Sequence, residues 1–191
     1  MACALTRSRA EACKDVVAGI KEVYFADFGA LDTVTLTNDE ITNMTGATGD
    51  ITLHKYEVKG NNSFETTVNA SRENGTVFYE QTLNITLKKL TKEDNKELKL
   101  LAAARPHVIV VDKNDNVFMM GLKEGADVTA GTVSTGNALG DFNGYNLTFT
   151  AQETSPPNFV STSGPDTANF PVDGMAGLDG TITIGTPVAV Q

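Results

Sequence analysis

The sequence predicts a mainly β fold, an antiparallel β-sandwich or barrel with one flanking α-helix and long hairpin arms. Three observations support this prediction. Several segments alternate apolar and polar residues with the period of two that marks half-buried strands. Clusters of Gly, Asn and Asp separate these segments as turns. One segment, beginning near Thr91, carries the capping pattern of a helix.

The first third of the chain predicts an arm and three strands. Residues 1–18 are polar and predict an arm, with a short helix over Arg9–Val17 as the alternative. Ile20–Phe28 is rich in Tyr and Phe between two glycines, which favours a strand with a bulge. Next come a short strand, a loop with a helical turn at Asp39–Asn43 left open, and another strand: Thr33–Thr37, 38–50 and Ile51–Lys59.

A long hairpin is predicted next. Phe64–Ser71 and Thr76–Lys89 read as strands joined through Glu73-Asn74-Gly75, because Asn-Gly accepts positive φ at low cost. At about 3.3 Å per residue the second strand is longer than usual, so we expect it to overhang a small sandwich and contact a neighbouring subunit. The candidate intersubunit residues are Phe64, Val77, Tyr79, Leu83, Ile85 and Leu87.

One helix is predicted between this hairpin and the second half of the chain. Thr91 caps it, and acidic residues occupy the first turn, where the helix dipole favours them. Pro106 ends the helix near Ala104. The spacing predicts a buried apolar stripe made of Leu98, Leu101 and Ala102, with Leu90 just ahead of it.

The stretch Arg105–Glu153 predicts the main sheet. Two apolar runs are joined by the turn Asp112–Asn116, and two alternating strands follow: His107–Val111, Val117–Leu122, Asp127–Ser134 and Tyr145–Thr150. After Glu153 the chain becomes rich in Pro and Gly, which predicts a loop-like extension ending in an edge strand over Thr181–Val190. The predicted regions are an arm, a β domain and an extension: 1–18, 19–153 and 154–191.

The polar residues predict no catalytic, cofactor or metal site. The turn Asp112–Asn116 begins with the spacing of a calcium loop, but Val117 and Lys123 stand where its Gly and Glu belong, which favours a plain turn. His54 and His107 lie in strands without the ligand spacing of a metal site. We therefore expect a protein that is not an enzyme and needs no cofactor.

Charge and cysteine content narrow the class of partner. The net charge of −9 argues against non-specific binding to DNA or anionic lipid. The sequence contains no run of eighteen apolar residues, so we expect no membrane span. The N-terminus lacks the apolar core of a secretory signal. Cys3 and Cys13 are expected to be reduced thiols made in a cytoplasm, with a disulfide between them as the alternative.

The segment from Val108 to Glu153 also carries a pattern known from other proteins. A hairpin around Asp112 precedes a Thr- and Gly-rich segment and a Gly-Tyr-x-Leu-Thr-x-x-x-x-Glu strand over Gly144–Glu153. This pattern resembles the C-terminal half of bacteriophage tail tube proteins. The segment 13–28, and the long strand followed by the Leu90–Ala104 helix, also resemble phage structural proteins. The likeness covers roughly residues 12–153.

The resemblance implies a structural subunit of tail-tube type that forms six-membered rings, which stack into the virion tail tube used for DNA ejection. It implies as partners further copies of the chain, other phage tail or neck proteins, and DNA that passes without specific binding. The subunit would be made in the host cytoplasm and reside in the virion tail. Two alternatives remain, a single-layer ring or connector protein of a neck or short tail, and a monomeric capsid decoration or adhesin module.

An acidic balance suits a conduit for DNA, because an acidic wall repels phosphate whereas a basic wall would bind it. The candidate lumen-facing acids lie on or near the predicted strands: Asp50, Glu57, Glu65, Glu73, Glu80 and Glu153.

Overall fold

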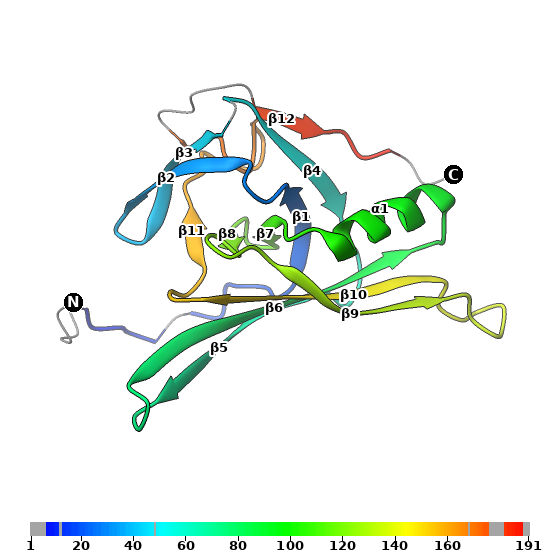
Figure 1. The fold of residues 1–191 in the computed structure, drawn as a ribbon, viewed down its shortest axis with the longest axis horizontal. Coiled ribbons are helices and arrows are strands. Elements are labelled where there is room, and N and C mark those ends of the chain that lie inside the picture. Colours follow the sequence, from blue (N-terminus) through cyan, green and yellow to red (C-terminus); the bar gives the residue numbers. More distant parts are fainter. Residues whose placement is uncertain (1–6, 12, 48, 168, 176–181, 189–191) are drawn as a thin grey trace.

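The computed structural model describes residues 7–11, 13–47, 49–167, 169–175 and 182–188, and over these residues the fold is mainly β with one helix, as predicted (Figure 1). In chain order, the elements are β1 Ile20–Ala26, β2 Leu31–Thr37, β3 Glu40–Gly46, β4 Ile51–Glu57, β5 Ser63–Ser71, β6 Thr76–Lys88, α1 Lys92–Ala103, β7 His107–Asp112, β8 Val117–Met120, β9 Asp127–Ser134, β10 Gly144–Glu153, β11 Asn158–Val160 and β12 Ile182–Gly185. The eight-stranded sheet has the order β12-β4-β1-β7-β8-β11-β3-β2, and the four-stranded sheet has the order β5-β6-β10-β9.

Strand β7 separates two hydrophobic cores. Because successive side chains of a strand point to opposite faces, Val108 and Val110 pack into one core while Ile109 and Val111 pack into the other. The first core lies between the two sheets and includes Leu83, Ile85, Leu147 and Phe149 from the small sheet. The second lies on the other face of the large sheet and includes Ile41, Met44, Ile51 and Leu53. This double burial explains why β7 is a continuous apolar run rather than an alternating one.

The predicted bulge in β1 is confirmed, because the pairing of β1 with β7 shifts register between Ile20 and Glu22.

The predicted loop over residues 38–50 is wrong, since β3 lies within it and pairs with β2. Asn38 and Asp39 join these strands with φ values of 53° and 64°. Two consecutive positive φ angles are typical of a tight hairpin turn, so this Asn-Asp pair makes a hairpin and not the helical turn considered for Asp39–Asn43.

Helix α1 has the predicted cap but not the predicted burial. The Thr91 hydroxyl accepts a hydrogen bond from the Asp94 amide at 3.0 Å. Leu98 and Leu101 are half-buried against the core between the sheets, whereas Ala102 is exposed, and no residue of the helix is fully buried. The predicted buried stripe is therefore wrong in degree, because the helix packs at the rim of this core.

The chain after Glu153 is part of the fold and not a separate extension. Strand β11 lies between β8 and β3, and the second core includes Phe170, Val172 and Met175. The predicted boundary at residue 154 is therefore wrong. A strand of three residues is too short to show a period of two, so no local pattern predicts β11.

The predicted C-terminal edge strand is confirmed over β12, while residues 181, 189 and 190 of that prediction lie outside the described residues. Strand β12 pairs with β4, and β11 with β3, in parallel, whereas the other ladders of the two sheets are antiparallel as predicted.

The N-terminal segment is an exposed arm. Residues 7–11 and 13–18 are exposed and contain no helix, which favours the arm over the helix considered for Arg9–Val17. Cys13 is an exposed free thiol, whereas Cys3 lies outside the described residues. None of the described helical segments has the length and apolar character to cross a bilayer.

Candidate assembly surfaces

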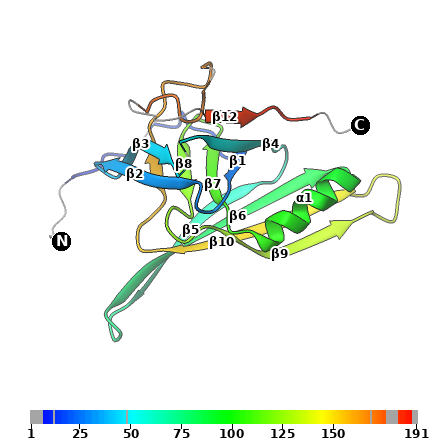
Figure 2. The same cartoon turned by 45° about the horizontal axis from the view of Figure 1, so that its top comes forward.

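The outer part of the β5–β6 hairpin extends beyond the rest of the subunit. Strand β10 covers β6 only as far as the pair Glu153–Tyr79, so residues 68–78 form a two-stranded tip. Figures 1 and 2 show this tip projecting from the body of the molecule. Its apolar side chains are exposed on both faces, since Val68 and Val77 lie on one face with 58% and 53% exposure and Phe78 lies on the other with 38%.

The structure divides the six candidate intersubunit residues into two groups. Leu83 and Ile85 are fully buried in their own core, and Phe64 and Leu87 pack against the same core. The prediction that Leu83 and Ile85 face a neighbour is therefore wrong. They share a face of β6 with Val77, and the large sheet covers this face at Leu83 and Ile85 but not at Val77. Val77 is exposed and Tyr79 half-buried, so the open end of that face is the hairpin tip.

The candidate acids do not form one group either. Glu153 is only 4% exposed, and its Oε1 accepts hydrogen bonds from the Lys123 and Glu124 amides at 2.8 and 3.1 Å. The prediction that Glu153 faces a lumen is therefore wrong, since this carboxylate holds the loop before β9. Asp50 and Glu57 are exposed at the two ends of β4, in the large sheet.

Glu65 and Glu80 share the outer face of the small sheet, and Glu73 lies exposed in the turn of the same hairpin. The shared face follows from register, because Glu65 pairs with Thr82 and Thr67 with Glu80. The structure thus brings these three predicted acids onto one hairpin.

Hydroxyl and amide side chains cover the same outer face. The Thr129 and Thr150 hydroxyl oxygens lie 2.9 Å apart, and the Thr148 hydroxyl donates to Asn84 Oδ1 at 2.8 Å. The Asn84 amide then donates to the Ser63 hydroxyl at 3.2 Å, which carries the row of contacts from β9 across β10 and β6 to β5. This face is therefore polar, and its side chains bond to one another across the strands.

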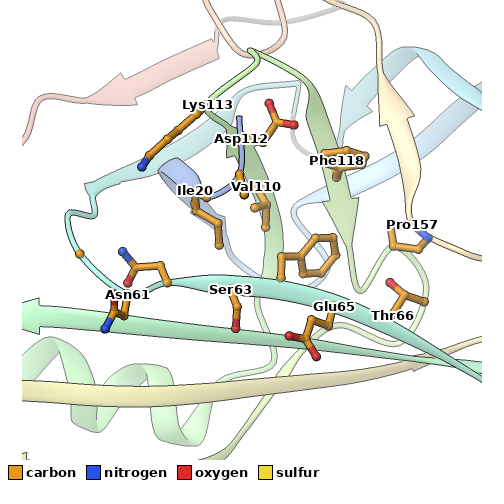
Figure 3. A pocket seen from close by; sticks show the side chains of 15 residues that line it. Ile20, Asn61, Ser63, Glu65, Thr66, Val110, Asp112, Lys113, Phe118 and Pro157 are labelled. Atoms are coloured by element: carbon orange, nitrogen blue, oxygen red, sulfur yellow. The ribbon is translucent and has the colours of Figure 1, made fainter. Parts of the chain in front are cut away.

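A groove of about 770 Å³ opens beside β5, and Figure 3 shows it between the two sheets. Ser63, Phe64, Glu65 and Thr66 line one side, whereas Ile20, Val110, Phe118 and Pro157 line the other. The Phe64 and Phe118 ring centroids are 6.1 Å apart. The floor is thus mainly apolar, and Asp112 and Lys113 supply charge at one end.

The residues considered for metal binding have structural partners. Asp112 Oδ1 accepts from the amides of Asn114 and Asn116 at 2.7 and 2.8 Å, which builds the predicted plain turn between β7 and β8. A ring nitrogen of the buried His107 lies 2.7 Å from the Gly121 carbonyl oxygen, while His54 is exposed on β4. Within the described residues, no group of three His, Cys, Asp or Glu side chains has the arrangement of a metal site.

A charged cluster lies on β1 and β4. Tyr24 donates to Glu22 Oε2 at 2.6 Å, and Lys55 Nζ lies 2.8 Å from Glu22 Oε1. Burial acts to raise the pKa of Glu22, but the hydrogen bonds from Lys55 and Tyr24 outweigh it and hold that pKa below its ordinary value. Burial, together with the bond to Glu22, raises the pKa of Tyr24. The charges of this cluster are thus balanced within it.

Two features of these surfaces escaped sequence reasoning. The Asn114 side chain clasps the arm, since its Oδ1 accepts from the Val17 amide at 2.9 Å and its Nδ2 donates to the Val17 carbonyl at 2.7 Å. The groove beside β5 joins residues from distant parts of the chain, so no local pattern predicts it.

Comparison with protein-family models, curated proteins and solved structures found no match to this chain.

Proposed function

We propose that this chain is a structural virion protein of a bacteriophage, whose copies form rings that stack into the tail tube, the conduit for DNA during ejection. The observation that carries the proposal is the hairpin tip, residues 68–78. Its apolar residues are exposed on both faces and contact no other strand of the described subunit. Exposed apolar surface and unpaired strand edges favour association with another chain, and a further copy is the partner that a repeating assembly supplies.

The outer face of the small sheet suits the inner wall of such a conduit. It presents hydroxyl and amide groups together with Glu65 and Glu80. Carboxylates repel phosphate, so DNA would slide past this wall without the counterion release that holds it to a basic surface. Edge-to-edge pairing of the small sheets, through the edge strands β5 and β9, would make the wall continuous around a ring.

The first test is the state of the purified full chain. Light scattering gives its mass, and negative-stain electron microscopy gives its form. Stacked tubes support the proposal. Isolated rings favour the connector alternative. A monomer across the micromolar range favours the decoration or adhesin alternative and contradicts self-assembly.

A pair of variants then tests the role of the tip. Val77→Asp places a charge on the exposed apolar face, and we expect loss of assembly with little change in subunit melting. Leu139→Asp is the matched control, because Leu139 is fully exposed in the loop between β9 and β10. Assembly that survives Val77→Asp as well as it survives Leu139→Asp would remove the tip from the interface.

A further inference from the structure

We infer that the groove beside β5 binds the outer part of the N-terminal arm, residues 7–16, of a neighbouring copy as an extended segment. This inference rests on the proposed function, because it names the segment through which one copy holds the next. The groove is defined by the residues that line it between the sheets, among them Phe64, Phe118 and Pro157 (Figure 3).

The groove contains a hydrogen-bond donor without an acceptor. Asn62 lines the groove and is 9% exposed. Its Oδ1 accepts from the Thr86 amide at 2.8 Å, which fixes the orientation of the side-chain amide. Its Nδ2 has no hydrogen-bond partner within the described part of the chain. Buried amide groups are normally satisfied, and the carbonyl oxygens of an extended segment are acceptors of the kind this donor lacks.

The arm leaves its own subunit at one end of the same groove. Asn114 bonds to both the amide and the carbonyl of Val17, and Ala18 lines the groove. Beyond this clasp, residues 7–11 and 13–16 are exposed. Figures 1 and 2 both show the arm on the side of the molecule from which the hairpin projects. The base of the arm is therefore fixed, and its outer part is available to a second subunit.

The outer part of the arm matches the groove in length and shape. Ten extended residues span about 33 Å, comparable to the nine-residue strand β5 that forms one wall. Over residues 7–10, Ser8 and Ala10 alternate with Arg7 and Arg9, so this part of an extended arm turns small side chains to one face. That small face fits against the aromatic floor.

Disulfide trapping tests this inference with the native thiol of the arm. One full chain carries Cys3→Ser and keeps Cys13, and a second chain with a longer tag carries Cys3→Ser, Cys13→Ser and Thr66→Cys, because Thr66 pairs with the buried Gln81 and lines the groove. The two chains are co-expressed and mildly oxidised. Disulfides form readily only when the two Cα atoms lie within about 7 Å. We expect a mixed dimer on a non-reducing gel, at least about tenfold stronger than with Thr129→Cys, at the opposite edge of the small sheet.

The same samples are imaged, so that this inference and the proposed function can fail separately. Rings or tubes without the mixed dimer overturn the arm inference and leave the proposed function standing. A mixed dimer without rings or tubes supports the arm inference and contradicts the proposed function. A single chain that carries both Cys13 and Thr66→Cys reports on the remaining case, because a disulfide formed only within that chain would show that the arm occupies its own groove and overturn the inference.

Discussion

Strand β7 and the tip of the β5–β6 hairpin both contain β-branched residues, yet they lie at opposite extremes of burial. Both faces of β7 pack into a core. Both faces of the tip are open, with Val68, Val77 and Phe78 exposed. The stability of the subunit therefore depends on β7 and not on the tip, although the Asn74-Gly75 turn of the tip is a strong hairpin signal. A strand that its own subunit does not need for stability is available for contacts with another copy.

The largest expected effect on the free energy of unfolding comes from comparing one substitution in β7 with one in the hairpin tip. Ile109→Ala removes a fully buried side chain from the second core, and we expect it to lower the free energy of unfolding by about 2–5 kcal/mol. Val77→Ala in the tip should change it by no more than about 0.5 kcal/mol. Urea denaturation of both variants measures the difference, and equal losses would contradict the division between the two regions.

A smaller effect separates two of the candidate acids in the same way. Glu153→Ala leaves the Lys123 and Glu124 amides without their acceptor, and we expect a loss of about 1–3 kcal/mol in the free energy of unfolding. Glu73→Ala, in the exposed hairpin turn, is the control and should be nearly neutral. If Glu153→Ala melted like the parent, its buried carboxylate would have no structural role.

The smallest effect concerns helix α1, which is intermediate between the two extremes. Leu101→Ala removes a half-buried side chain at the rim of the core between the sheets, so we expect a loss of about 1 kcal/mol. Leu100→Ala, whose side chain is 55% exposed one position earlier, should cost less. Thermal unfolding of the two variants measures these losses. If Leu101→Ala lowered the free energy of unfolding as much as Ile109→Ala does, the helix would contribute to the core as fully as β7.

Local chemistry predicted most of the fold. The Thr91 cap and the Asn74-Gly75 turn were correct because each depends on neighbours a few residues away. Strand β3 was missed because Asn38-Asp39 makes a tight turn without the glycine that usually announces one. Strand β11 was missed because its three residues are placed by β8 and β3, which are distant in the sequence.

The candidate surfaces were predicted only in part, for a related reason. Period-two alternation places Val77, Leu83 and Ile85 on one face, but it does not say where along that face the second sheet ends. That limit comes from the large sheet, whose side chains cover Leu83 and Ile85 but leave Val77 exposed. The groove and the Asn114 clasp on Val17 depend on contacts across the whole chain, which a single sequence does not display.

The position of β7 between two cores has a consequence for synthesis of the chain. Neither core can close until His107–Asp112 has been made, and the second core also waits for Phe170, Val172 and Met175. The β5–β6 hairpin is translated before these residues, and its tip, residues 68–78, pairs only within the hairpin. On the ribosome, this exposed tip can thus form before the body that carries it.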